Sequence, residues 1–321
     1  MNMAVCKFGG TSLADGNNIK RAAEILLSDP ARKYVVVSAP GKRFSEDVKV
    51  TDLLYACYQE SAQTGSCGEA FAKIRKRFQS IVDELGLHFD IQPILDKTEA
   101  EIVARKSADF AASRGEYLNA RIMAALLGWE FVDAKDIIFF DAKGAFDEKK
   151  SYPLIEERLK RAGHAVVPGF YGTDADGNIK TFSRGGSDIS GSIVARAVNA
   201  DVYENWTDVS GFLACDPRIV KNPEKIEVIS FKELRELSYM GANVLHAEAI
   251  FPVRKGDIPI KIKNTFRPED AGTLILPSKK YTPHGNIVTG IAGKKDFTVI
   301  FIEKLLMNSE IGFARRALSV L

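Results

Sequence analysis

The sequence predicts an α/β fold, a three-layer αβα sandwich with a mainly parallel central sheet. Its opening carries this prediction: Met3–Phe8 is a short apolar strand, Asn17–Leu27 has helical spacing, and Tyr34–Ala39 is a β-branched run typical of a buried strand. A strand, a helix and a second strand in this order favour parallel pairing with helices on the faces of the sheet. At 321 residues, the chain is long enough for one large domain and a small appendage.

The elements that follow alternate in the same way. Residues 52–127 are mostly helical by the spacing of their apolar side chains, and further helices are expected at Ile189–Asn199 and Phe231–Ile250. Asp174–Asn178 is a strong turn signal between two extended stretches and predicts a hairpin. Further strands are expected at Glu130–Asp133, Ile137–Asp141, His164–Gly169, Val202–Trp206, Ile258–Lys263 and Thr273–Leu276.

A domain boundary is predicted near residue 282, where the pattern starts afresh. Residues 1–282 are expected to form the main domain, and residues 283–321 a linker and an incomplete second domain. In this tail, Ile287–Ala292 and Phe297–Ile302 have the pattern of strands, and Glu310–Leu321 that of a helix with one apolar face. Because no partner strands follow, we expect the tail to pack on the main domain, pair with another chain or remain poorly ordered.

Composition argues against several classes of protein. The net charge of +2 gives no reason to expect a general affinity for nucleic acid or anionic lipid. No apolar run approaches the ~20 residues needed to cross a bilayer, and the N-terminus has no signal-peptide pattern. The four cysteines show no CxxC spacing, and Cys6 lies in an apolar run that suits a buried free thiol, which fits a reducing, cytoplasmic setting.

Two glycine pairs lie where a strand passes into a helix. In Lys7–Ser12, glycines let backbone N–H groups approach an anion, and the lysine can lie beside phosphoryl oxygens. Ser183–Asp188 opens a later helix, and its Arg184 suits a carboxylate. Each loop alone has an ordinary explanation, a tight turn with a surface lysine for the first and helix caps at Ser187 and Asp188 for the second. Together they predict two anion sites that face each other.

A third loop, Thr207–Gly211, follows the strand at Val202–Trp206, and Asp216-Pro217-Arg218 comes shortly after it. Ligands of open α/β sheets lie beyond the carboxyl ends of strands, so this loop is a candidate for the same site. The alternative is a turn-rich loop in which Asp216-Pro217 starts a turn. The Walker A spacing and the HRD and DFG signatures of protein kinases are absent.

Six motifs, in order, resemble the signatures of the aspartate kinases, which have the amino acid kinase fold. They are KFGGTS at 7–12, RGE at 114–116, RGGSD at 184–188, WTDVSG at 206–211, DPR at 216–218 and GANVLH at 241–246. The resemblance covers roughly residues 3–282, and the tail from Ile291 resembles the start of the family's first ACT domain. It implies ATP-dependent phosphorylation of the side-chain carboxylate of L-aspartate to 4-phospho-L-aspartate, the first step toward lysine, threonine and methionine.

The resemblance also implies roles for individual residues. Lys7 would stabilise the transferring phosphoryl group and Asp188 would order the catalytic centre. The substrate would be bound by Ser38, Thr51, Glu116, Arg184 and Ser187, with Glu116 on the ammonium and Arg184 on the α-carboxylate. ATP would be bound by Lys7, Gly9, Gly10, Ser12, Thr207, Asp208, Asp216 and Arg218. Two positions depart from the common family pattern, because Leu213 stands in place of a tyrosine and Asn243 in place of a lysine near the nucleotide.

The partners implied are L-aspartate, ATP and a second copy of the chain in a homo-oligomer. Mg²⁺ is expected to bind mainly through ATP, with no protein-only metal cage. The alternatives are another kinase of this fold, acting on glutamate, N-acetylglutamate, carbamate or a nucleotide, and a non-catalytic amino-acid sensor. Glu116 favours a substrate with a free ammonium, and Lys7 with both glycine loops argues against a sensor. We expect residues 291–321 to lack a complete effector pocket, so lysine and threonine should inhibit this chain little.

Overall fold

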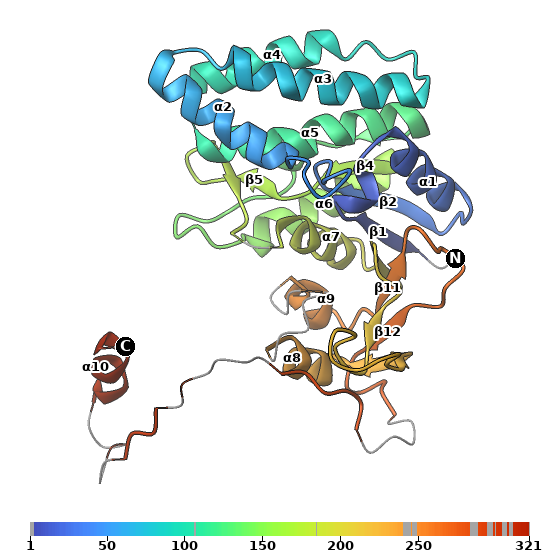
Figure 1. Ribbon diagram of the computed structural model, residues 1–321, viewed down its shortest axis with the longest axis vertical. Helices are drawn as coiled ribbons and strands as arrows, with labels where there is room; N and C mark the ends of the chain where they lie inside the picture. Colours follow the sequence, from blue (N-terminus) through green and yellow to red (C-terminus); the bar gives the residue numbers. More distant parts are fainter. Residues whose placement is uncertain are drawn as a thin grey trace.

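The computed structural model describes residues 3–105, 107–183, 185–239, 249–282, 288–293, 300–303 and 311–320, together with Leu245, Thr298 and Met307. Within them, one eight-stranded sheet has the order β10-β12-β11-β7-β1-β2-β4-β3 (Figure 1). Its strands are β1 (Ala4–Phe8), β2 (Arg32–Val37), β3 (Glu130–Phe131), β4 (Ala165–Pro168), β7 (Val202–Thr207), β10 (Val228–Ser230), β11 (Ile260–Asn264) and β12 (Thr273–Leu276). Each neighbouring pair is parallel except β11 with β12, so the predicted mainly parallel sheet is confirmed.

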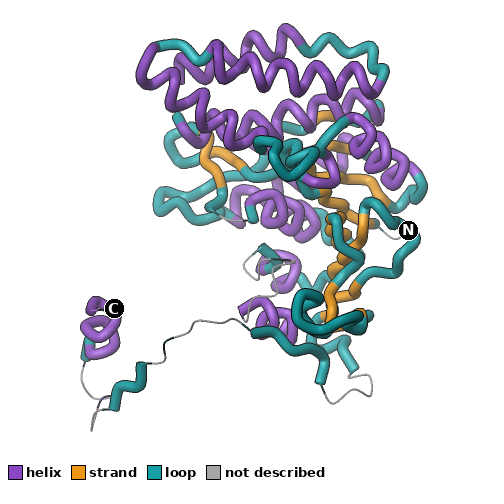
Figure 2. The backbone as a smooth tube through the Cα atoms, in the orientation of Figure 1, coloured by secondary structure: helices purple, strands orange, loops and turns teal. Residues whose placement is uncertain are grey.

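Helices cover both faces of this sheet, as Figure 2 shows in purple around the orange strands. On one face, α7 (Gly186–Ala197) packs against β1, β2 and β7, with α6 (Glu148–Ala162) beside it. On the other, α1 (Gly16–Leu27) and α5 (Ala108–Leu127) contact β2. The remaining helices of this side, α2 (Val50–Thr64), α3 (Gly68–Leu85) and α4 (Gln92–Arg105), stack around α5 as an outer layer (Figure 1). No helix in the described part of the chain has the length and apolar content needed to span a membrane.

Local sequence explains where these helices begin and end. The side chain of Asp15 accepts a hydrogen bond from the Asn18 N–H at 2.8 Å and caps the start of α1. Ser107 caps α5 in the same way through the Phe110 N–H. At the other end, α2 stops at Gly65, whose φ of 78° is a left-handed conformation that glycine adopts without a Cβ clash.

The hairpin predicted around Asp174–Asn178 is confirmed. β5 (Tyr171–Thr173) and β6 (Ile179–Thr181) pair antiparallel, and the Asp174 carboxylate accepts N–H groups of Asp176 and Asn178 at 3.0 and 2.8 Å. A second short antiparallel pair, β8 (Phe212–Leu213) with β9 (Lys225–Ile226), lies between β7 and β10 in the sequence and has no counterpart among the predicted strands.

The sheet order brings three loops to one edge. β1 lies between β2 and β7 in parallel register, with Lys7 opposite Val36 on one side and Asn205 on the other. The segments that leave the carboxyl ends of β1, β2 and β7 therefore emerge side by side. Gly9, Ser38 and Thr207 lie at or just beyond these ends, where ligands of open α/β sheets bind.

One predicted strand, Ile137–Asp141, is wrong. Ala134–Asp136 forms a 3₁₀ turn (η2), and beyond it Phe139 and Phe140 make only isolated bridges, to Thr173 and Phe146. The apolar side chains of this run are buried all the same, since Ile138 and Phe140 pack into the core. Burial in a packed loop leaves the same apolar pattern as burial in a strand, so the pattern could not separate the two.

The predicted helix at Phe231–Ile250 is shorter. α8 covers Phe231–Tyr239, and the described residues Leu245, Ala249 and Ile250 are not helical. A separate helix, α9 (Phe251–Lys255), begins with Pro252 in its first turn, a position that proline favours. The sequence prediction also had no helix at α6, although Tyr152, Ile155, Leu159 and Ala162 recur at helical spacing.

The tail differs from its predicted strands. Within Ile287–Ala292 and Phe297–Ile302, none of the residues that the structure describes belongs to a strand. The predicted helix is confirmed as α10 (Phe313–Val320), none of whose described side chains is buried. In Figure 1, α10 lies apart from the layered part of the molecule.

Candidate active site

Two adjoining cavities open at the carboxyl edge of the sheet. The smaller, of about 250 Å³, is lined by Lys7, Phe170, the start of α7 and three residues shared with its neighbour. The larger, of about 370 Å³, is lined by the glycine loop at Gly10 and by the segment after β2. Ser38, Thr51 and Glu116 line both, so the two form one continuous site.

Lys7 and Asp188 form a close ion pair in the smaller cavity, with 2.7 Å between Nζ and Oδ1. Lys7 comes from the central strand and is 7% exposed, and Asp188 lies in the first turn of α7. Asn205, the register partner of Lys7 on β7, donates its Nδ2–H to the same Asp188 oxygen at 2.7 Å. This ion pair brings the start of the first glycine loop next to the end of the second, and the two facing anion sites stay a prediction.

Glu116 is a buried carboxyl group facing both cavities. It lies on α5, is 5% exposed, and its Oε2 has no hydrogen-bond partner among the described residues. Removal from water raises the pKa of Glu116 to about 8, against the lowering effects of backbone hydrogen bonds and of Arg114 and Lys7. A buried acceptor of this kind suits a cationic ligand group, which would favour its charged form.

The first glycine loop is held by the backbone around it. The Gly9 N–H donates to the Trp206 carbonyl at 3.0 Å, and the Gly10 carbonyl accepts from Leu13 and Gly41. Ser12 is fully buried and its Oγ accepts from the Thr265 hydroxyl at 2.8 Å, so this side chain faces the core. Gly10 and Thr11, rather than Ser12, are the residues of this loop that line the larger cavity.

The predicted substrate residues come from four different elements. Ser38 follows β2, and its carbonyl accepts the side-chain amide of Asn119 at 2.7 Å. Thr51 lies in the first turn of α2, Glu116 lies on α5, and Ser187 lies in the first turn of α7, where it is 8% exposed. All four line the smaller cavity. Arg184 lies outside the described residues.

The backbone around the start of α7 is tightly packed. Phe170, after β4, lines the smaller cavity with a φ of 78°, which is strained for a residue with a side chain. Its N–H donates to the Ser190 hydroxyl at 3.0 Å and its carbonyl accepts from Phe182. A Cβ on Gly186 would come within 2.3 Å of the Phe170 ring, so this second glycine allows a close approach.

Of the predicted nucleotide residues, Lys7 and Gly10 line the cavities, whereas the others lie outside the described lining: Gly9, Ser12, Thr207, Asp208, Asp216 and Arg218. Thr207 ends β7, and its hydroxyl donates to the Asp208 carboxylate at 3.2 Å. Asp216 and Arg218 pair with each other at 2.6 Å on the surface, where Arg218 lowers the pKa of Asp216 to about 2. Leu213 is 37% exposed, and Asn243 is outside the described residues.

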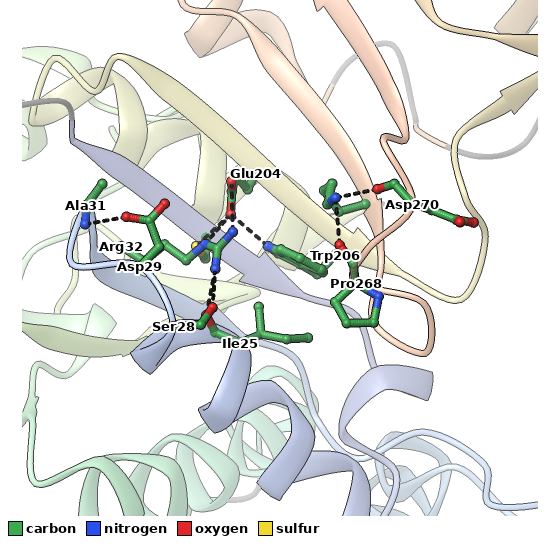
Figure 3. Close-up of polar contacts among 11 residues, drawn as sticks. Ile25, Ser28, Asp29, Ala31, Arg32, Glu204, Trp206, Pro268 and Asp270 are labelled. Atoms are coloured by element: carbon green, nitrogen blue, oxygen red, sulfur yellow. Dashed lines mark hydrogen bonds and ion pairs between the residues drawn. The ribbon is translucent and has the colours of Figure 1, made fainter.

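A largely buried polar network is centred on Glu204 of β7 (Figure 3). The Glu204 carboxylate accepts from Arg32 Nε at 2.8 Å, from Trp206 Nε1 at 3.0 Å and from the Cys6 thiol at 3.4 Å. The Trp206 ring stacks on Phe8 at 5.7 Å, and Arg32 lies 5.2 Å from its centre. This network ties together Cys6 of β1, Arg32 of β2 and the side chains of Glu204 and Trp206 on β7. Cys6 is confirmed as a buried free thiol, and burial raises its pKa.

Sequence reasoning missed three residues that support this site: Asn205, Asn119 and Phe170. Each bonds to a predicted site residue or lines the cavity with it. Asn205 had a usable signal, because a polar amide in the otherwise buried run VYENW needs a partner. Asn119 had none, because an amide on a long helix is ordinary until its contact with Ser38 is seen.

Comparison with known proteins agrees with this geometry. The amino acid kinase family profile matches residues 2–264. Aspartokinase 3 of Bacillus subtilis is 41% identical over 99% of this chain and 73% of that protein. The crystal structure of Clostridium acetobutylicum aspartate kinase superposes with a TM-score of 0.91 at 54% identity, covering 100% of this chain and 73% of that one.

A third relative was solved with ligands bound. Escherichia coli aspartokinase III, in complex with aspartate and ADP, has a TM-score of 0.74 at 28% identity, over 86% of this chain and 65% of that one. The sequence motifs, the mainly parallel sheet and the Lys7–Asp188 pair between two glycine loops agree with these matches. The chain therefore belongs to the amino acid kinase family, and within it to the aspartokinases.

Proposed function

We propose that this chain transfers the γ-phosphoryl group of ATP to the side-chain carboxylate of L-aspartate, which yields 4-phospho-L-aspartate and ADP. This is the first step by which aspartate is committed to lysine, threonine and methionine. The observation that carries the proposal is the Lys7–Asp188 pair at 2.7 Å, set between two glycine loops and next to the buried Glu116, whose Oε2 has no hydrogen-bond partner among the described residues. The E. coli relative solved with aspartate and ADP supports the same pair of ligands.

The proposed reaction is an in-line displacement. One oxygen of the β-carboxylate attacks the γ-phosphorus and forms the new oxygen–phosphorus bond. The bond from the γ-phosphorus to the β,γ-bridging oxygen breaks, which releases ADP. A carboxylate is already a nucleophile at neutral pH, so catalysis consists of positioning and of neutralising charge. Lys7 would stabilise the transferring group, and Asp188, which bonds Lys7 and Asn205, would hold the lysine in position.

Substrate recognition is proposed to use the two ends of the amino acid. Glu116 would take the ammonium, because its buried carboxyl lines the cavity and its Oε2 has no hydrogen-bond partner among the described residues. Arg184 would take the α-carboxylate, with Ser187, Ser38 and Thr51 around it. The N–H groups of Gly10 and its neighbours would face phosphate oxygens. Gly9, Ser12, Thr207, Asp208, Asp216 and Arg218 remain proposals for the nucleotide side, and for Ser12 the contact with Thr265 favours a supporting role.

Mg²⁺ is proposed to enter with ATP. In the described part of the chain, no three His, Cys, Asp or Glu side chains gather as a metal site. Mg²⁺ commonly keeps water and substrate phosphates as most of its ligands, so an ATP-borne ion fits the donors of this site. When bound, it would neutralise phosphate charge, while the residues named above orient the two substrates.

The cellular setting of the reaction is also a proposal. We expect a cytoplasmic enzyme, acting as a homo-oligomer, with no nucleic acid or membrane partner. The cysteines fit a reducing compartment, because all four are free thiols.

The test is acyl phosphate formation trapped with hydroxylamine. With ATP and Mg²⁺, the chain should form hydroxamate from aspartate, and much less from glutamate or N-acetylglutamate. A preference for N-acetylglutamate, which has no free ammonium, would show that Glu116 does not bind an ammonium group. It would indicate another kinase of this fold. Failure to form hydroxamate from any of the three, with ATP shown to bind, would contradict catalysis and favour an amino-acid sensor.

A further inference from the structure

Arg77 is a buried cation whose partners belong to the active-site loops. It lies on α3, in the outer helical layer, and its side chain is 5% exposed. Its guanidinium donates to the Ala14 carbonyl at 2.8 Å, to the Gly41 carbonyl at 2.7 Å and to the Asp47 carboxylate at 2.7 Å. A buried charge needs such partners, and here they come from the end of the glycine loop and from the loop after β2.

These two loops also touch each other directly. The Gly41 N–H donates to the Gly10 carbonyl at 2.8 Å. A Cβ on Gly41 would lie 2.6 Å from the Gly10 carbonyl carbon and 2.8 Å from the Thr11 nitrogen, so the two backbones are in contact. Gly10, Thr11 and Gly41 all line the larger cavity. A shift of either loop must therefore move the wall of the site.

Asp47 completes the arrangement by folding the second loop onto Arg77. Its Oδ2 accepts from Arg77 Nη1 at 2.7 Å and from the Arg43 N–H and Nε–H at 3.0 and 2.8 Å. These guanidinium groups hold the pKa of Asp47 well below its usual range, so the carboxylate stays charged at any working pH. The loop closed in this way carries Lys42 and Lys49, which line the larger cavity beside Thr51.

We propose that Arg77 is a positioning residue for phosphoryl transfer, which sets the distance between the glycine loop and the loop at 40–49. Arg77 itself is outside the described lining of both cavities, so it acts through Gly41, Ala14 and Asp47. This inference rests on the proposed kinase activity. Because phosphoryl transfer depends on alignment, a displacement of about 1 Å in these loops is enough to cost about 10²-fold in rate.

The competing explanation is that Arg77 only stabilises the fold, and Arg75 provides a matched control. Arg75 lies on the same helix and bonds Gln92, Asp96 and Glu99 at 2.7, 2.7 and 2.9 Å, all on α4. Its loss removes a similar set of polar contacts without touching either loop. The two variants therefore separate an effect on the site from an effect on stability.

The experiment compares Arg77→Met, Arg77→Lys and Arg75→Met in the hydroxamate assay, at least 15 °C below each unfolding midpoint. Arg77→Met should lower kcat about 10²-fold, with KM for aspartate changed much less. Arg77→Lys, which keeps the charge but cannot reach all three acceptors, should lower kcat about tenfold. Arg75→Met should keep kcat within about twofold even if its midpoint falls. A folded Arg77→Met with near-normal kcat would overturn the proposal.

Two further measurements keep the test decisive. If Arg77→Met fails to fold, Asp47→Asn replaces it, and unchanged kinetics there would equally reject the proposal. If the wild-type chain forms no hydroxamate, the proposed function is wrong. The proposal that Arg77 holds the two loops together is then tested by amide hydrogen exchange. The backbone amide hydrogens of residues 9–14 and 38–47 should then exchange at least about tenfold faster in Arg77→Met than in Arg75→Met. Equal exchange rates in the two variants would reject the positioning role of Arg77.

Discussion

Lys7 and Asp188 are opposite charges that are largely removed from water and held 2.7 Å apart. Such a pair contributes little reliable stability, because desolvation offsets much of its attraction. Its position at the carboxyl end of the central strand is better explained by chemistry. Asn205 shares the same carboxylate oxygen, so the lysine ammonium is held in one place before any substrate arrives.

Lys7→Ala should lower kcat by about 10²-fold or more, the scale for losing a preorganised charge that stabilises a transition state. Aspartate binding should change much less, because the predicted substrate contacts lie elsewhere in the cavity. Steady-state hydroxamate assays give kcat, and calorimetry gives the affinity for aspartate. A near-normal kcat in this variant would show that Lys7 does not stabilise the transferring phosphoryl group.

Glu116→Gln tests the buried carboxyl through the pH dependence of stability. Burial raises the pKa of Glu116 to about 8, whereas the unfolded chain releases this proton near the ordinary glutamate value. Between these pH values the folded state holds a proton that the unfolded state has lost, so the contribution of Glu116 to stability falls as pH rises, by up to about 1.4 kcal/mol per pH unit.

The amide of Glu116→Gln cannot ionise, so the free energy of unfolding of this variant should fall less between pH 5 and pH 8 than that of the wild type. Urea titrations of both proteins across this range measure the difference. Parallel curves would mean that Glu116 is ionised in the free protein. The same variant should bind aspartate weakly, because a neutral amide replaces the proposed partner of the ammonium.

At the scale of elements, α8 shows how one residue can cap a helix and hold a loop. Ser230 and Glu233 form a capping box, with the Ser230 N–H donating to Glu233 at 2.9 Å and the Glu233 N–H donating to the serine hydroxyl at 3.2 Å. The other Glu233 oxygen accepts from Thr289 at 2.6 Å and from Tyr281 at 3.3 Å. The helix start and the segment after β12 therefore share one carboxylate.

Glu233→Ala should lower the free energy of unfolding by about 1–2 kcal/mol, the scale for losing a cap, and should make cleavage by proteases next to Tyr281 and Thr289 faster. Glu236→Ala on the same helix is the control, because Glu236 is 58% exposed and pairs with Arg235 at the surface. Urea unfolding and limited proteolysis read the two effects. If both variants lost the same free energy of unfolding and were cleaved at the same rate, Glu233 would not hold the helix start and the segment after β12 together.

At the scale of the whole molecule, the described tail exposes apolar side chains that the main domain does not cover. Phe301 is 85% exposed, and on and beside α10 Ile311, Leu318 and Val320 are 101%, 72% and 88% exposed. Apolar surface of this kind favours contact with another copy of the chain or another apolar surface.

We expect concentration-dependent self-association that is weakened by the double substitution Phe301→Glu and Leu318→Glu. Light scattering after size-exclusion chromatography should show the average mass rising with concentration in the wild type and staying closer to 35.3 kDa in the variant. Leu27→Glu, at a residue 64% exposed on α1, is the control for added charge. A wild type that stays monomeric throughout would reject the prediction.

Much of the fold could be predicted because its signals are local. β1, α1 and β2 follow from apolar periodicity, and the β5–β6 hairpin follows from the turn residues around Asp174, because these depend on a few neighbouring residues. The strand predicted at Ile137–Asp141 failed for the same reason. Its apolar pattern reports burial, and only packing against the hairpin decides whether a buried run pairs as a strand.

The sequence by itself determined the family, the mainly parallel sheet and the two glycine loops, because motifs and strand patterns depend on residues that are close together in the chain. Only the tertiary structure decided which side chains meet. Lys7 lies 181 positions before Asp188, and Arg77 reaches Gly41 and Ala14 across the helical layer. Contacts between residues far apart in the chain depend on sheet order and register, and these become visible only when the whole molecule has folded.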